Sequence, residues 1–384
     1  MTLLEAGSEA DALEQLHALG LTDGLPVVVP TPQRVAAMVL ATGLDADLEL
    51  GVMGPAHGVA SVEKVATAAV MAGCLPDHVP VVVAAVRAVC KPEFDLTEMQ
   101  STTHCTAPLV VVCGPARHQC GGVVSGFGAL GPGHRANASI GRALRLAMTN
   151  IGGARPGVSD MALHGHPGKF TYCLAEDAEH SPFEPLHTGY GYGPERSAVV
   201  VVGAEAPHSV IFAGDADDPA SADRLLNVLA AALANPGSNN AHLRHGAVTV
   251  IVNPDHATVL ARAGLNREDV QAELAARSVN TAATLAHVSS AFAVDPEAGR
   301  AADRDRPAAG DAAEDEHAAD ELVPILTDPS KIVLFQAGGS GLYSMVMPSW
   351  CAGPHRNSVV HAEIELNQAC EVPWADAARA GAPA

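Results

Sequence analysis

The sequence predicts an α/β protein made of two α/β halves with a cleft between them. Short Val-rich runs with the length and β-branched content of buried strands occur in both halves of the 384-residue chain, separated by stretches with helical spacing of apolar residues. Residues 27–48 also share an order with residues 250–270: a Val-rich run, a Pro turn, a helix pattern and a Gly-Leu break. This echo favours pseudo-symmetric halves, although two unrelated βα units would give the same pattern.

Each echo is followed, after further helix, by an apolar run that enters a glycine loop, at residues 113–114 and 337–339. Open α/β folds place their sites at the carboxyl ends of strands. If the pseudo-symmetry holds, both loops therefore face one cleft between the halves.

The composition limits the classes of partner. Apolar residues make up 48% of the chain and aromatic residues 3%, so the core must consist mainly of Val, Ala and Leu. The net charge of −21, without a basic run, argues against nucleic acid and against an anionic membrane. An acidic protein that binds an anion must gather its few cations locally, so four residues stand out: Arg135, Arg142, Arg145 and Lys169.

The chain carries no sign of secretion or of membrane insertion. Residues 1–22 lack a basic segment and an apolar segment, and they predict a short amphipathic helix. No run approaches about 18 apolar residues, and the eight cysteines include no C-x-x-C pair, which removes the plainest zinc and thioredoxin-type interpretations. We expect a cytoplasmic homo-oligomer with reduced thiols.

The first half is expected to span residues 23–205. Thr31 and Pro32 have the N-cap and first-turn chemistry of a helix that stops at Gly43. The expected elements are strands at 25–29, 108–113, 170–175 and 197–203 and helices at 32–41, 62–72, 79–89 and 137–150. Residues 152–196 are dense in Gly, Pro and His, and such a long loop with several aromatic residues favours an ordered site.

The second half is expected to span residues 206–375. Its expected strands lie at 248–253, 332–335 and 359–366, and its expected helices at 220–234, 256–263 and 267–276. An Ala-rich acidic stretch at about 294–322 predicts a solvated, mobile insertion, and residues 376–384 a disordered tail.

A strand, a glycine loop and a helix start follow one another in residues 103–145, an arrangement that can present backbone N–H groups to an anion. It predicts a cradle for a carboxylate or phosphate group, made of Gly131, Gly133, Arg135, Asn137 and Arg142. The alternative is that the glycines form turns and the arginines are surface charges. The loop matches neither a Walker A nor a Rossmann pattern, which disfavours nucleotide binding.

Several side chains are candidates for the chemistry. His104 is the expected general base, Lys169 the cation that stabilises developing negative charge, and the expected partner acid is Glu176, Glu184 or His187. His164 and His166 are candidate ligands of a divalent metal ion, and the sequence leaves the identity of any cofactor open. Gly339, Ser340 and Ser344 of the second glycine loop are expected to bind the same ligand. Each group also has a purely structural interpretation. Cys105, next to His104, would be a buried thiol, the histidines and Lys169 would belong to a polar surface loop, and the second glycine loop would be a simple turn.

Long phrases of the chain resemble one bacterial family. They include VEKVATAAVMAGC, GALGPGHRANASIGRALRL, HPGKFTYCLAE and SPFEPLH, within residues 20–205. The family is the largely uncharacterised one associated with UGSC-motif, selenoprotein-type proteins. The resemblance implies an ancient cytoplasmic enzyme-like family and no particular reaction. The chain has no Cys-Gly-Ser-Cys or Gly-Gly-Ser-Cys, so a redox role built on that motif does not carry over.

These observations lead to three hypotheses. The first is an enzyme of lyase or hydrolase type that acts on a small anionic substrate by acid–base chemistry, with or without a metal ion. The second is a thiol-redox or metal-handling protein that uses Cys105, Cys113, Cys120 and Cys173. The third is a non-catalytic protein whose two halves close on a small molecule.

Overall fold

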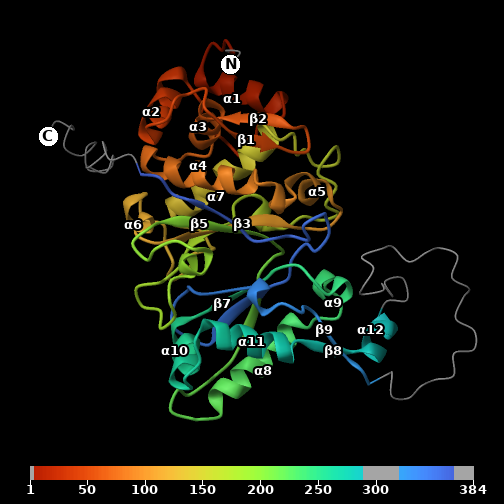
Figure 1. Cartoon of the computed structure of the whole chain (residues 1–384). Helices are drawn as coiled ribbons and strands as arrows, with labels where there is room; N and C mark the ends of the chain where they lie inside the picture. The colour runs from red at the N-terminus through yellow and green to blue at the C-terminus, as the bar shows by residue number, and fades with distance from the viewer. Residues whose placement is uncertain (1–3, 289–319, 367–384) are drawn as a thin grey trace, which may run out of the picture.

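The computed structural model describes residues 4–288 and 320–366, and it confirms the α/β class (Figure 1). The predicted N-terminal helix is α1 (Glu9–Ala18), with Ser8 as its N-cap. All but the last three residues of the predicted insertion at 294–322, and the whole predicted tail, lie outside the described residues.

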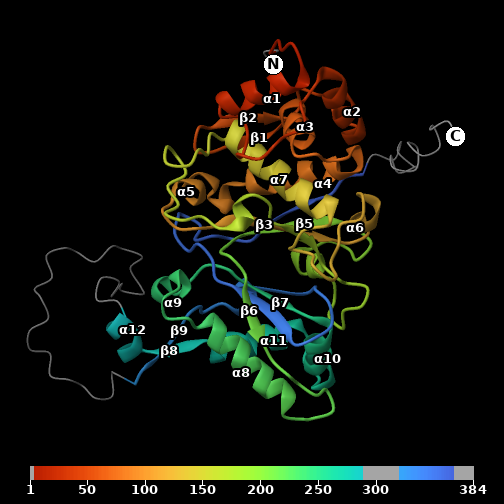
Figure 2. The same cartoon turned by 180° about the vertical axis from the view of Figure 1, so that it is seen from behind.

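Two four-stranded sheets lie face to face, and helices cover the outer face of each, so the molecule has four layers (Figures 1 and 2). The first sheet has the order β12-β5-β3-β4 and the second β10-β7-β11-β6. The strands of the first sheet are β3 (Ala107–Cys113), β4 (Cys173–Ala175), β5 (Ala198–Ala204) and β12 (Val360–Glu363). Those of the second are β6 (His208–Ile211), β7 (Val248–Val252), β10 (Ile332–Gln336) and β11 (Tyr343–Met347).

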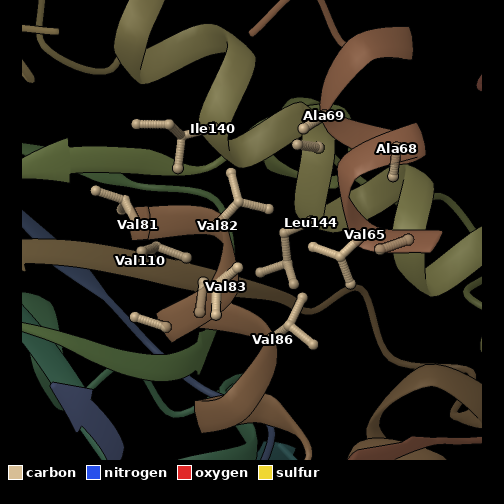
Figure 3. Packing of buried hydrophobic residues seen from close by; sticks show 14 of the residues in the cluster. Val65, Ala68, Ala69, Val81, Val82, Val83, Val86, Val110, Ile140 and Leu144 are labelled. Carbon is tan, nitrogen blue, oxygen red and sulfur yellow. The ribbon is translucent and has the colours of Figure 1, made fainter. Parts of the chain in front are cut away.

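The first helical layer packs on one face of β3 and β5. Its main helices are α2 (Pro32–Thr42), α3 (Val62–Met71), α4 (Val79–Val89) and α7 (Arg135–Asn150). Because side chains alternate along a strand, Val110 and Val112 join the cluster formed with these helices, as Figure 3 shows for Val110, whereas Leu109 and Val111 point to the other sheet. Each such Val contributes roughly 1.5–3 kcal/mol when fully buried.

The second helical layer consists of α8 (Ser221–Leu233), α10 (Pro254–Arg262) and α11 (Arg267–Arg277). The facing surfaces of the two sheets share one apolar cluster, to which the second sheet contributes Ile251, Val333 and Phe335. The predicted cleft between the halves is not confirmed, because these side chains fill the space between the facing strands.

The two sheets have the same strand arrangement. From β4 or β10 inwards, each has one parallel pair and then two antiparallel pairs. The two sheets exchange their outer antiparallel strands. In the chain, β6 follows β3, β4 and β5 of the first sheet, but it pairs with β11 of the second sheet. Likewise β12 follows β7, β10 and β11 of the second sheet, but it pairs with β5 of the first sheet. The expected boundary at residue 205 therefore misplaces β12.

This correspondence matches β3 with β7, whereas the sequence echo paired residues 27–48 with 250–270. Residues 25–29 form no strand, although the following helix α2 has the predicted Thr31 cap and ends at Gly43 in a left-handed conformation. A spatial two-fold relation between the halves stays a prediction.

Shorter elements complete the described chain. They are β1 (Glu49–Met53), β2 (Gly58–Ser61), α5 (Leu96–Ser101), α6 (Ala116–Gln119), α9 (Asn239–Leu243), β8 (Val279–Thr281), α12 (Ala282–Val288) and β9 (Leu322–Pro324). Single 3-10 turns are η1 (Pro76–His78), η2 (Pro92–Phe94), η3 (Pro167–Lys169), η4 (Leu186–Tyr190) and η6 (Pro329–Lys331). Within the described residues, no helix combines the length and the apolar character needed to cross a bilayer.

Candidate functional site

A pocket of about 740 Å³ lies beside α7, between residues 22–24 and the loop at 156–170. The pocket is lined by four residues that the sequence singled out, together with Asp160: they are Arg145, His164, His166 and Lys169. Apolar walls come from Pro156, Ala162, Pro167 and Phe170. Loops position most of this wall, while α7 supplies Arg145.

Two cations meet on one carboxylate in the pocket wall. The Lys169 ammonium lies 2.8 Å from Oδ1 of Asp160, and the Arg145 guanidinium lies 2.9 Å from Oδ2. All three side chains are largely buried, with exposed fractions of 14%, 12% and 4%. Asp160 is fixed locally because its Oδ1 also accepts the Ala162 N–H.

The ionisation of this trio follows from its contacts. Burial opposes the ionised form of Asp160, but the hydrogen bonds and charges of Lys169 and Arg145 prevail and hold its pKa below the usual value. Burial is also the main influence on Lys169, and it lowers the pKa of the ammonium although Asp160 acts in the opposite direction. With Asp160 ionised, two positive charges share one negative charge.

His104 belongs to a second polar group, which does not line the pocket. Its Nε2 lies 2.8 Å from Oε1 of Glu205, and both side chains are mostly buried. Because a carboxylate can only accept, Nε2 carries the proton of a neutral ring and Nδ1 keeps its lone pair. The neighbouring Cys105 is half-buried, and burial together with the Glu205 charge raises the pKa of its thiol. Lys169 lies near enough to oppose that rise.

The two histidines that the sequence proposed as metal ligands differ in environment. His164 is exposed on the pocket wall. His166 is half-buried and accepts the Gly168 N–H at Nδ1, and burial, followed by the Lys169 charge, lowers its pKa to about 4. Neither belongs to a group of three close metal-ligating side chains within residues 4–288 and 320–366.

The expected anion cradle is taken up by intramolecular contacts. Arg142 forms a two-pronged ion pair with Asp23, at 2.7 and 2.8 Å. The Asn137 side chain accepts the Val124 N–H at Oδ1, and its Nδ2 donates to the carbonyl oxygens of Val124 and Ala129. The Arg135 guanidinium donates to the Gly73 carbonyl. These side chains, with Gly131 and Gly133 in the turn that precedes them, shape the glycine loop, and the bonds named here are all made within the protein.

The second glycine loop touches the first one, not the pocket. The Gly338 N–H donates to the Ser125 carbonyl at 2.6 Å, and Gly339 packs on the Phe127 ring so closely that a Cβ atom would lie 2.1 Å from it. Ser344 is buried and bonded to His256, while Ser340 is exposed. None of the three predicted ligand-binding residues of this loop, Gly339, Ser340 and Ser344, lines the pocket.

The predicted partner acids lie at the other end of β3. Glu184 is exposed, whereas Glu176 and His187 are buried beside Cys113 at the carboxyl end of the strand. Residues 107–113 of β3 span roughly 20 Å, so Glu176 and His187 cannot act with His104 at one reacting atom. The sequence prediction of one site is therefore replaced by two separate polar groups.

The buried group is compact. One ligand atom each of Cys113, Glu176 and His187 lies within 4.8 Å of the others, the one such group of three found among the described residues. Such a set of sulfur, oxygen and nitrogen donors could hold a metal ion. Burial is the main cause that raises the pKa of both the Cys113 thiol and the Glu176 carboxyl.

Sequence reasoning missed Asp160, Glu205 and Arg267, and it noted Arg145 as a cation without including it in the predicted site. A signal for Asp160 was present: it is the single carboxylate between Glu98 and Glu176, a stretch that contains six Lys or Arg residues. An isolated acid among so many cations marks an ion-pair centre. Glu205 and Arg267 carry no comparable local signal.

Comparisons with known proteins add no relative. No family model, no curated protein and no solved structure matches the chain.

Proposed function

We propose that the chain is an enzyme of lyase or hydrolase type that acts on a small carboxylate- or phosphate-bearing substrate in the pocket at Lys169. The observation that carries the proposal is that Lys169 and Arg145 share the one carboxylate of Asp160, so that, among the described residues, the two cations of this partly enclosed wall have a single ion-paired carboxylate between them. In a chain of net charge −21, these two cations attract an anion locally.

The roles follow from position and protonation. Arg145 and Lys169 would bind the anionic group and stabilise negative charge that develops next to it. His104, oriented by Glu205, would act as the base once substrate binding gives access to its Nδ1, which is buried, has a lone pair and has no partner among the described residues. The neutral His166 and the exposed His164 complete the polar side of the pocket.

A titration with anions tests the proposal. We expect inorganic phosphate or a small mono- or dicarboxylate to bind the wild type with a calorimetric signal, and Lys169→Met to weaken that binding about 10- to 100-fold, as expected for one charge-assisted hydrogen bond. Lys331→Met, which removes a lysine from the second half, is the matched control and should bind like the wild type. Equal binding by Lys169→Met and the wild type would refute the assignment.

Turnover separates the enzyme from the non-catalytic binding protein. With the anion that binds best, we expect slow product formation by the wild type and a loss of at least about tenfold in His104→Gln with binding retained. Binding without turnover of any related substrate would favour the binding protein.

The metal-handling alternative is favoured by a different observation, the Cys113, Glu176 and His187 group. The metal-assisted enzyme with His164 and His166 as ligands has no such support. Homo-oligomerisation and a cytoplasmic location stay predictions. Exposed apolar side chains of the loop at 156–170, Val158, Leu163 and Phe170, are suited to an association surface that light scattering can test.

A further inference from the structure

The carboxyl ends of β3 and β4 bring three metal-ligating side chains together inside the protein. Cys113 ends β3, Glu176 follows β4, and His187 lies in the 3-10 turn η4. Their exposed fractions are 0%, 1% and 0%. Burial of three polar side chains at one point is costly unless each finds a partner.

His187 has an unsatisfied atom at this point. Its Nε2 lies 3.2 Å from the Gly193 carbonyl oxygen, which can only accept, so Nε2 carries the ring proton. Nδ1 is then an unprotonated acceptor, and it is buried without a hydrogen-bond partner. A histidine that donates one ring N–H to a backbone carbonyl and keeps the other nitrogen free has the arrangement found around metal ions.

The carboxylate is oriented in the same way. Glu176 accepts the Leu186 N–H at 2.8 and 3.0 Å from its two oxygens, and Arg267 of α11 lies 3.3 Å from Oε1. Arg267 is itself fixed by a bond to the Leu334 carbonyl. These outer contacts hold the carboxylate, and the Arg267 charge offsets one of the two negative charges that Glu176 and a Cys113 thiolate would carry.

We propose that Cys113, Glu176 and His187 bind one divalent transition-metal ion, with Zn²⁺ the best match to the mixed sulfur, nitrogen and oxygen donors. A tetrahedral Zn²⁺ has ligand distances of about 2.0–2.3 Å, so its donors lie roughly 3.3–3.8 Å apart. The donor atoms here lie within 4.8 Å of one another, so an ion would draw them together by at most about 1.5 Å. Binding releases the thiol proton to solvent.

The site is separate from the pocket, since it lies roughly 20 Å away at the opposite end of β3, and its three side chains are buried. Three protein ligands leave the fourth position of a tetrahedral ion to a water molecule. A bound ion would join the ends of β3 and β4 to η4, and through Arg267 it would support the contact between the halves. The inference is independent of the proposed function, since neither requires the other.

Cobalt titration of the whole purified chain after chelation tests the site, because a cobalt–thiolate bond gives a charge-transfer band in the near ultraviolet. We expect one equivalent of Co²⁺ to produce this band in the wild type and excess Zn²⁺ to remove it. Cys113→Ser should lose the band. Cys173→Ser is the matched control, since Cys173 is a buried thiol of the same sheet whose side chain faces the helices, and it should keep the band.

The Tm of the wild type with and without Zn²⁺ tests the site even if Cys113→Ser does not fold. Zn²⁺ in excess over the chelated protein should raise the Tm by about 4 °C or more, because the ion binds the folded chain preferentially. No cobalt–thiolate band in the wild type overturns the proposal, as does a band of equal strength in Cys113→Ser or the absence of any rise in Tm.

Discussion

Replacement of Asp160 by Asn removes the carboxylate that Lys169 and Arg145 share and leaves two largely buried cations side by side. Removing one partner of a buried ion pair typically costs about 3–5 kcal/mol. The side chains of Lys169 and Arg145 retain exposed fractions of 14% and 12%, so we expect a loss near the lower limit, about 3 kcal/mol of the free energy of unfolding.

The size of this loss should depend on pH, because the pKa of Asp160 differs between the folded and the unfolded chain. The pKa of Asp160 is lowered in the folded protein, so its stabilising contribution is fully present above the unfolded value of 3.8 and is lost as the pH falls through the lowered folded value. The difference between wild type and Asp160→Asn should therefore be constant near neutral pH and shrink below about pH 4.

Urea unfolding followed by circular dichroism measures this difference, at about pH 7 and at the lowest pH at which both proteins fold. Glu9→Gln is the control, because Glu9 forms an ion pair with Arg34 in which both side chains are exposed, and it should cost less than about 1 kcal/mol. A loss in Asp160→Asn no larger than in Glu9→Gln, or one that does not shrink in acid, would show that Asp160 is not the anchor of this trio.

Three further predictions test the frame around the pocket and the loops. Asn137→Ala removes three hydrogen bonds to buried backbone and should lower the free energy of unfolding by about 2–4 kcal/mol, with faster amide exchange at Val124 as the local readout. Gly114→Ala should cost more than about 2 kcal/mol in urea unfolding, because φ is +81° and the new Cβ would lie 2.2 Å from a carbonyl oxygen. Gly122→Ala, at a φ of +74° in open space, should cost about 1 kcal/mol, and equal losses would contradict the steric argument. Burial lowers the pKa of His166 from 6.5 to about 4, so the unfolded chain binds more protons than the folded chain between these two pH values. The Tm should therefore decrease as the pH is lowered from 6.5 to about 4. His166→Gln should flatten that fall in scanning calorimetry.

The sequence was informative where a local pattern has one physical solution. The strand predicted at 108–113 is β3 at Ala107–Cys113, because a β-branched run of this length, bounded by Thr-Ala and by Gly-Pro, can bury both faces between layers. Thr31, Pro32 and Gly43 delimit α2 because their preferences depend only on local backbone geometry. The helix predicted from residue 137 begins two residues earlier, at Arg135.

Side-chain roles were predicted less well because they depend on partners distant in sequence. Arg142 looks like a free guanidinium until folding brings Asp23, 119 residues away, against it. The exchange of β6 and β12 between the sheets is equally invisible locally, since neither strand carries a mark of the sheet that it joins. The strand predicted at 25–29 has a suitable composition, yet its Arg142 and Met71 contacts hold it as an irregular segment.

The distribution of charge explains why Lys169 and Arg145 share one carboxylate. Residues 99–175 contain six Lys or Arg and one carboxylate, so this segment must obtain its other counter-charges from elsewhere in the chain. Asp23 forms an ion pair with Arg142 at 2.7 Å, and Asp177 forms one with Arg117 at 3.4 Å. Asp160 is the one carboxylate within residues 99–175, and it forms ion pairs with both Arg145 and Lys169. A substrate carboxylate or phosphate at this point would supply a second negative charge, which is why the pocket at Asp160, and not the glycine loop, is where we expect an anion to bind.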